Sequence, residues 1–273
     1  MTHAYISHTK SGHPLMDTGL AIAMHAVPGV TGLNKFGTNE SVTTSFSYLW
    51  EFGDGWTPIP TATTLEVAST SALDTAGGTG ATGLTIEGLD DNYDEISDTV
   101  ALNGQTPVVT TKLFLYVNRA FITGAGSTEK NQGSIYVADD STAWSSGVPV
   151  TDAAVQGLIN PLHGQTQQVI YTVPAGFTAF VHDGYMTTEA NIITRLRVMF
   201  WNRFTNAHRT AFEMTIKGPT FSHAPYPYVP FLEKNSVYME VSVSAGTTTV
   251  SGGLNFVLVD NKQLGDEFDF PPS

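Results

Sequence analysis

The sequence predicts an all-β protein: a β-sandwich, jelly-roll-like in type, with an extended and irregular N-terminal arm. Three observations predict this class. Only 14% of the 273 residues are charged. Thr, Ser, Gly and Val recur throughout, whereas the Ala-, Leu-, Glu- and Lys-rich runs typical of helices are absent. Short stretches of alternating apolar and polar residues follow one another between turn residues, which is the pattern of half-buried strands.

Residues 1–60 are predicted to be the arm, because they show no sustained period and are punctuated by Gly, Pro and Asn. The apolar run at 20–27, "LAIAMHAV", is too short to distinguish a strand from a helical turn. Aromatic residues at 46, 48, 50, 52 and 56 fall near strand spacing, so their side chains share one face. This face packs either on the body of the same chain or across a neighbouring subunit.

Residues 61–140 are predicted to form a first β half, a meander or half-sandwich, with strands near 64–68, 83–89, 94–102, 110–123 and 133–138. Residues 141–273 form the second, jelly-roll-like half, which closes with a short acidic tail. Its later strands are expected near 192–204, 209–217, 235–243 and 253–260. Between them, Pro174, Ala175 and Gly176 have the chemistry of a hairpin turn, since Pro fixes the first turn position and Gly takes the left-handed one.

The stretch 74–90, "DTAGGTGATGLTIEGLD", contains a G-x-G-x-x-G pattern at Gly78, Gly80 and Gly83. A dinucleotide-binding loop needs a strand before these glycines and a helix after them. Both flanks alternate like strands, so the helix is missing. We interpret the glycines as a mobile or bulged connection between two strands, in which small residues lie close to another backbone.

Composition excludes several classes of partner and chemistry. The chain has no cysteine, and its net charge is −13 with only 12 Lys and Arg. A nucleic-acid binder needs a basic face, so nucleic acid is not an expected partner. The first 16 residues lack the basic and apolar regions of a secretory signal, and no apolar run is long enough to span a bilayer, so no membrane association is expected.

The densest charge feature is a cluster of acids at Glu87, Asp90, Asp91, Asp94, Glu95 and Asp98. An EF-hand that starts at Asp90 would need Gly where Glu95 stands and Glu where Ala101 stands, so the pattern fails. A looser calcium site stays open as an alternative to a solvated hairpin tip. A glycosidase pair cannot be recognised from sequence spacing.

The histidines show no metal-binding or catalytic spacing. His3, His8, His13 and His25 are spread through the arm, and His163, His182, His208 and His223 stand alone. Although His182 precedes Asp183, adjacent residues on a strand point to opposite faces. No nucleophile elbow, zinc-protease helix motif, P-loop or kinase signature occurs. We therefore predict no catalytic residues, no cofactor and no metal site.

Four of the five arginines fall within "NIITRLRVMFWNRFTNAHR". If 192–204 is one strand, alternate residues build an apolar core face, and the opposite face carries Arg195, Arg197, Trp201 and Arg203. Arg and Trp often carry the binding energy of protein interfaces. This basic, aromatic face meets either carboxylates of a neighbouring subunit, such as the 87–98 acids, or acids of its own chain.

The order of several motifs resembles virion structural proteins of tailed bacteriophages, especially marine ones. The motifs are "LNKFGTNESV", "TLEVASTSALDTAGGTGATGLTIEGLD", "LNGQTPVV", "LYVNRAF", "IYTVPAGFTAFV" and "FLEKNSVYMEVSVSAGTTTVSGGLNFVLVDN". They extend over most of residues 25–261. Each motif consists of ordinary strand and turn residues, but their order is specific. Gly83 and the wording "LYVNRAF" depart from the usual pattern without bearing on function.

The resemblance implies a non-enzymatic subunit of the virion, with no catalytic residues to carry over. The favoured role is a capsid decoration or cement protein on the capsid surface. Its expected partners are the major capsid protein and itself, with a trimer favoured because closed symmetry reuses one interface. The alternatives are a tail or baseplate component that contacts host glycans, and a polysaccharide-degrading tail enzyme. The candidate protein-interface residues are Lys35, Phe36, Trp50, Trp56, Arg195, Arg197, Trp201 and Arg203.

Overall fold

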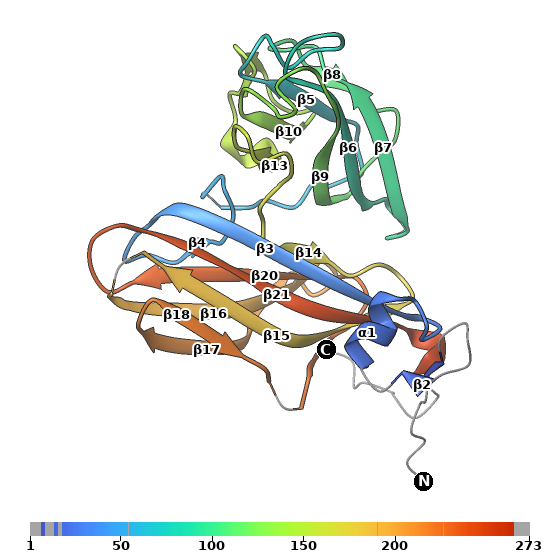
Figure 1. Cartoon of the computed structure of the whole chain (residues 1–273), viewed down its shortest axis with the longest axis vertical. Coiled ribbons are helices and arrows are strands. Elements are labelled where there is room, and N and C mark those ends of the chain that lie inside the picture. Colours follow the sequence, from blue (N-terminus) through green and yellow to red (C-terminus); the bar gives the residue numbers. More distant parts are fainter. Residues whose placement is uncertain are drawn as a thin grey trace.

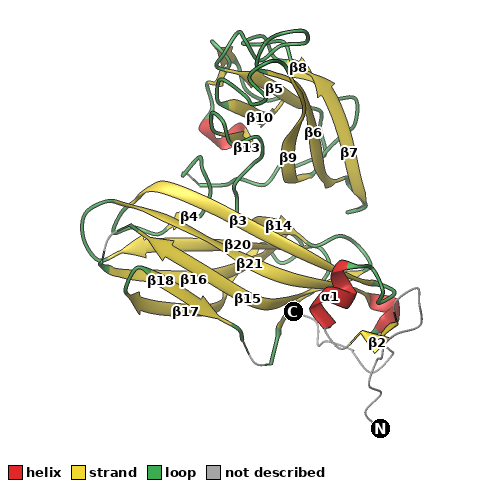
Figure 2. Ribbon diagram, viewed as in Figure 1, coloured by secondary structure: helices red, strands yellow, loops and turns green. Residues whose placement is uncertain are grey.

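The chain folds into two β-rich lobes, one stacked above the other (Figure 1). The computed structural model describes residues 7–8, 14–15, 18–53, 55–189, 191–225 and 227–264. Strands dominate both lobes (Figure 2). Helical structure in the described part is limited to α1 (Thr18–Ala23) and the 3-10 turns η1 (Asp152–Ala154) and η2 (Asn261–Gln263). None of these helices is long and apolar enough to cross a bilayer. The predicted all-β class is confirmed.

The lower lobe is a sandwich of two antiparallel sheets. In one sheet the strand order is β18-β15-β21-β3, and in the other it is β14-β20-β16-β17. If the eight strands are lettered B to I in chain order, these sheets read G-D-I-B and C-H-E-F, which is the strand order of a jelly roll. The strands are β3 (Val30–Val42), β14 (Ile170–Thr172), β15 (Phe177–Thr188), β16 (Ile193–Asn202), β17 (Ala207–Lys217), β18 (Thr220–His223), β20 (Asn235–Val243) and β21 (Thr248–Asp260). Short β4 (Ser47–Tyr48) pairs with β20, and β19 (Val229–Phe231) pairs with β15.

The sandwich core lies between these two sheets. Val181 of β15, Val198 of β16 and Val241 of β20 are fully buried within it. Strand β20 is buried along its whole length, because alternate side chains face different interiors. Met239 and Val241 enter the sandwich core, whereas Tyr238 enters a second cluster beneath the upper lobe. The central strand thus connects the core to the joint between the lobes.

The upper lobe is inserted between the first and second strands of the jelly roll. Its sheets have the orders β13-β10-β5-β8 and β7-β6-β9, and they enclose a separate core that includes Leu65, Leu84, Phe114 and Ile135. Its strands are β5 (Leu65–Ser69), β6 (Ala81–Leu89), β7 (Glu95–Ala101), β8 (Val108–Val109), β9 (Tyr116–Ala125), β10 (Ile135–Asp139), β11 (Trp144–Ser145), β12 (Val148–Pro149) and β13 (Val155–Ile159). A two-stranded pair, β1 (Ser7–His8) and β2 (Pro14–Leu15), precedes α1.

The boundaries of the arm and of the first β half differ from the sequence-based expectation. The arm expected over 1–60 contains β3, a strand of 13 residues that pairs with β21 along most of its length. The sequence of β3 shows no apolar–polar alternation, because the strand packs partly on polar neighbours and therefore contains Gly, Asn and Thr. The strand at Val155–Ile159 pairs with β10, so it belongs with the upper lobe although it lies beyond residue 140.

The turn at Pro174–Gly176 is not a hairpin. Gly176 has φ +78°, and Phe177 N–H donates to the Pro174 carbonyl, so the predicted turn chemistry is present. The strands on either side, however, pair with different partners: β14 with β20, and β15 with β21. The turn therefore carries the chain from one sheet of the sandwich to the other.

The glycine-rich stretch wraps a buried carboxylate of the chain itself. Asp74 has no exposed surface and accepts four hydrogen bonds, from Ser69 Oγ and from the backbone N–H groups of Ala81, Gln132 and Gly133, at 2.6–2.8 Å. A β-carbon on Gly80 would stand 2.1 Å from an Asp74 oxygen. The glycine is therefore needed for close approach, and no helix follows it.

We expect Asp74→Ala to lower the free energy of unfolding by about 3 to 5 kcal/mol, because it leaves four donors buried without an acceptor. Urea denaturation followed by circular dichroism measures this loss. Asp91→Ala is the matched control, since Asp91 is exposed, and it should stay within about 0.5 kcal/mol of the wild type. A loss below about 1 kcal/mol for Asp74→Ala would contradict the assigned role.

Candidate protein interface

The three tryptophans among the candidate interface residues are buried between the lobes. Trp50, Trp56 and Trp201 are 1%, 6% and 7% exposed, and all belong to one aromatic cluster. The ring of Trp56 lies 6.3 Å from Tyr116 of the upper lobe and 6.4 Å from Tyr238 of the lower lobe. The structure thus favours the alternative in which the aromatic face packs on the same chain, and these side chains are not accessible to a partner.

Arg203 also acts within the chain. Its guanidinium donates to the Pro60 carbonyl at 2.7 Å, to the Ile59 carbonyl at 2.5 Å and to the Tyr116 hydroxyl at 3.1 Å. It lies over the rings of Tyr116 and Trp201. Because Arg203 follows β16 of the lower lobe and its acceptors lie on the upper side of the joint, the side chain ties the lobes together.

Arg197 and Arg195 differ in how far their charges are satisfied within the chain. Arg197 forms an ion pair with Glu240 on the neighbouring strand and stacks 3.9 Å above the ring of Phe46. Arg195 lies on the same strand face and is exposed. Of the four basic and aromatic positions predicted on β16, Arg195 therefore offers the freest charge to a partner, while Arg197 has an acid of its own chain.

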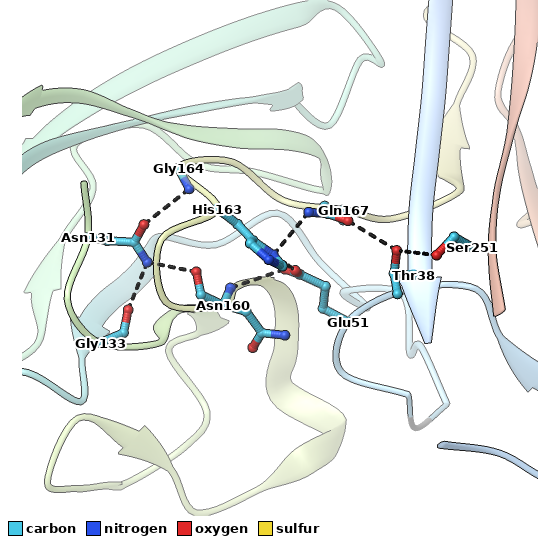
Figure 3. A network of polar contacts seen from close by, with 9 residues as sticks. All are labelled: Thr38, Glu51, Asn131, Gly133, Asn160, His163, Gly164, Gln167 and Ser251. Carbon is cyan, nitrogen blue, oxygen red and sulfur yellow. Dashed lines mark hydrogen bonds and ion pairs between the residues drawn. The ribbon is translucent and has the colours of Figure 1, made fainter. Parts of the chain in front are cut away.

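A polar network also crosses between the lobes (Figure 3). The largely buried Glu51 carboxylate contacts His163 Nδ1 and accepts the Asn160 N–H at 3.1 Å, and burial raises the pKa of this carboxyl group. Gln167 links His163 to Thr38 of β3, and Thr38 contacts Ser251 of β21 at 2.9 Å. This network fixes the loop after β13 onto strands β3 and β21 of the sandwich.

The two asparagines of Figure 3 hold the upper end of that loop. Asn131 has no exposed surface, and its side-chain amide donates to the carbonyls of Gly133 and Asn160, each at 2.8 Å. Its oxygen accepts the Gly164 N–H at 3.1 Å. The Asn131 amide thus uses both its nitrogen and its oxygen to hold residues 133, 160 and 164 together where the loop leaves the upper lobe.

Lys35 lines a polar groove between β3 and the upper lobe. The groove has a volume of about 650 Å³ and also contains Phe36, Glu87, Glu95 and Arg119 on its walls. Lys35 is 7% exposed, and its ammonium group donates to the Asn118 carbonyl of β9. Burial lowers the pKa of Lys35 to about 7; the Arg119 charge lowers it as well, and the Glu87 carboxylate opposes this. Among the sequence-predicted interface residues, Lys35 and the half-buried Phe36 are brought together here.

A second groove, of about 870 Å³, lies between α1 and the sheet that contains β3, β21 and β15. Its walls are mostly apolar, with Phe180 and Val257 among them, but it also contains the pair His182 and Asp183. Their side chains meet at 2.7 Å, and Asn255 donates to Asp183 at 2.7 Å. The prediction that His182 and Asp183 point apart was wrong, because a bulge between Val181 and Asp183 interrupts the alternation of β15.

The acid cluster at 87–98 is divided among separate local roles. Asp90 accepts the N–H groups of Asn92 and Asp94 and so closes the turn between β6 and β7. Asp98 accepts the N–H groups of Thr111 and Lys112, and these hydrogen bonds lower its pKa although its slight burial opposes them. Within the described ranges, no three acidic or histidine side chains converge as metal ligands would. His3, His13 and residues 265–273, which contain the acids of the predicted C-terminal tail, lie outside those ranges.

Comparisons with known proteins give only distant structural likenesses. No family model and no curated protein matches the sequence. One solved structure is "Structure of infectious bursal disease virus Gx strain", with 10% identity and a TM-score of 0.25, covering 89% of this chain and 73% of that chain. "Crystal Structure of the STIV MCP" has 9% identity and a TM-score of 0.24, covering 86% and 99%. "Crystal structure of PBSX exported protein XepA" has 10% identity and a TM-score of 0.18, covering 93% and 99%. Scores this low assign no role to the chain.

The contacts of Arg203 predict that Arg203→Ala uncouples the lobes. The substitution removes the donors to two carbonyls and should cost about 2 to 4 kcal/mol. In differential scanning calorimetry we expect the wild type to unfold in one transition and Arg203→Ala to unfold in two. Arg195→Ala, which removes an exposed arginine from the adjoining strand, should leave the profile unchanged. If Arg203→Ala unfolds in one transition at the wild-type temperature, Arg203 does not couple the two lobes.

The environment of Lys35 predicts a pH dependence of stability. An unfolded lysine has a pKa of about 10.4, so between pH 7 and 10 the unfolded chain binds a proton that the folded chain lacks. The free energy of unfolding should therefore rise with pH in this window, by up to about 1.4 kcal/mol per unit. In Lys35→Met this slope should disappear. Urea denaturation of both proteins from pH 6 to 9 tests this, and parallel curves would refute it.

Proposed function

We propose that this chain is a non-enzymatic structural protein of a virion, and that it decorates the head by binding the lattice of the major capsid protein. The observation that carries the proposal is the ordered series of motifs that resembles virion structural proteins of tailed phages. The motifs fall on both lobes: "LNKFGTNESV" lies on β3, "TLEVAS" on β5, and the last long motif extends from β19 through β21. The resemblance therefore extends to the framework of both lobes.

The architecture supports a structural role through the contacts that join its two lobes. An external subunit must keep its shape without disulfides, since the chain has no cysteine. Here the two lobes share the Trp56 contacts, the Arg203 hydrogen bonds and a reciprocal pair in which Asn118 of β9 donates to the Thr172 carbonyl and accepts the Thr172 N–H, at 3.0 and 2.9 Å. Jelly rolls are common in capsid proteins and in lectins, so the fold alone does not distinguish a capsid role from a sugar-binding role.

Self-association is part of the proposal, with a trimer favoured at local three-fold positions because closed symmetry reuses one interface. Among the predicted interface residues, Arg195 is exposed, and Phe36, Arg197 and Arg203 are half-buried. Arg197 and Arg203 already bind groups of their own chain, so Arg195 and Phe36 are the ones we propose for a neighbour. The 87–98 acids of another copy remain the proposed partner of Arg195. Attraction between an exposed arginine and carboxylates steers the approach of two chains more than it contributes to affinity.

A tail or baseplate protein that contacts host glycans is the second candidate. One observation favours it: the second groove combines apolar walls with fixed polar groups. Tyr228 is 47% exposed and its ring lies 5.3 Å from that of His182, while Asp183 and Asn255 hold each other in place. An aromatic surface beside a few oriented polar groups suits a small polar ligand such as a sugar.

Cryo-electron microscopy of whole purified virions tests the proposal. A decoration protein should appear in many copies on the icosahedral lattice, in contact with the major capsid protein. A few copies around the tail axis would overturn the head assignment in favour of the tail candidate. Absence of the chain from purified particles, checked by mass spectrometry, would overturn the virion role altogether.

A further inference from the structure

Two strand edges with no partner in the chain border the groove that contains Lys35. Strand β3 is the last strand of its sheet in the lower lobe, and β7 is the last strand of its sheet in the upper lobe. Within the described part of the chain, residues 31–38 make main-chain hydrogen bonds to no strand but β21, and residues 95–101 to none but β6. Gly32, Asn34, Glu95 and Ser97 from these edges all line the groove.

The register identifies which backbone groups of β3 face the groove. In an antiparallel pair, positions that exchange hydrogen bonds alternate with positions whose N–H and C=O point away. Asp260 N–H donates to the Gly29 carbonyl, so position 29 is bonded, and positions 31, 33 and 35 follow it. Asn34 therefore faces outward, as its short side-chain contact with Asn255 also indicates for a non-bonded pair. Positions 32, 34 and 36 thus present free N–H and C=O groups to the groove.

The same argument applies to β7. Asp90 N–H donates to the Asp94 carbonyl, so that pair is bonded and the pair Leu89 and Glu95 is not. The alternation turns the backbone groups of Glu95 and Ser97 away from β6 and toward the groove. Further along, Asp98 draws the segment at Thr111 and Lys112 alongside β7. The open part of the edge therefore coincides with the part that lines the groove.

Charge indicates the character of a strand that would fit here. Lys35 carries three donors, and within the described residues its one hydrogen-bond acceptor is the Asn118 carbonyl. Arg119 lies on the same wall, with its nearest carboxylate, that of Glu87, at 3.8 Å. A buried ammonium group gains most from a carboxylate that reaches it where water is excluded. Side chains of an added strand alternate between its two faces, so one acidic residue can point at Lys35.

We propose that this groove receives an extended strand of the major capsid protein, which pairs with the open edge of β3 and places an acidic side chain against Lys35. Main-chain pairing supplies the affinity, and the Lys35 contact supplies the specificity. The proposal rests on the proposed function, because it takes its partner from the capsid lattice. It explains why two open edges from different lobes border the same groove.

The decisive variant is Asn34→Pro. Proline removes the outward N–H of position 34 and leaves the ladder to β21 in place, as proline does on edge strands. Asn34→Ala is the matched control, since it loses the same side-chain contact with Asn255 but keeps the N–H. The assay is co-sedimentation of the full chain with capsids assembled from the major capsid protein alone. We expect Asn34→Ala to bind like the wild type and Asn34→Pro to bind at least about tenfold more weakly.

The outcomes separate this proposal from the broader one. If the wild type does not bind these capsids, the proposed head-decoration function fails, and the groove loses its partner with it. If the wild type binds and Asn34→Pro matches Asn34→Ala, only the groove assignment is overturned. Should Asn34→Pro fail to fold, amide hydrogen exchange of the wild type decides: the outward amides of β3, those of Gly32, Asn34 and Phe36, should become protected on capsids, and unchanged exchange would overturn the groove.

Discussion

The buried aromatic joint between the lobes is the contact on which the rest of the structure depends. The chain leaves the jelly roll after β3 and the short β4, which pairs with β20, and it returns at β14. The position of the inserted lobe therefore depends on contacts between the lobes. Tyr238 of β20 connects the two lobes, because one face of its strand lines the sandwich core and the other contacts Trp56. Removing this apolar area from water holds the insertion in one position, and Arg203 supplies a donor to the carbonyl of the buried Ile59.

Several of the longer strands could be predicted from alternation, since β5 to β7, β10, β16, β17 and β20 occur close to their expected ranges. Strand β3 could not, because it packs against polar groups of the upper lobe and the crossing loops. Its buried positions are Lys35, Gly37, Asn39 and Val42, and only the last of these is aliphatic. Gly37 is needed because a β-carbon there would stand 2.3 Å from the Leu49 carbonyl. Contacts of this kind depend on the tertiary fold and leave no period in the sequence.

The candidate interface residues also could not be understood from local sequence alone, because their partners are set by the tertiary fold. Residue type and strand spacing singled out Trp50, Trp56, Trp201 and Arg203 as candidates for an interface with another protein, but they could not show that these side chains contact another part of the same chain. An interface within a chain uses the same aromatic and arginine chemistry as one between chains. The contact of His182 with Asp183 was missed for another reason. It depends on a β-bulge, and a bulge changes which face a residue occupies without requiring any particular residue type.

The joint also determines what the open edges can do. Strands β3 and β7 belong to different lobes, so the separation of their edges is set by the contacts between the lobes and by neither sheet alone. Lys35 takes part in both features, because it bonds the Asn118 carbonyl across the joint and lines the groove between the edges. A rigid joint lowers the entropy lost when a strand binds, since the two edges are already in place. Loosening the aromatic cluster should therefore weaken strand capture even where no groove residue is changed.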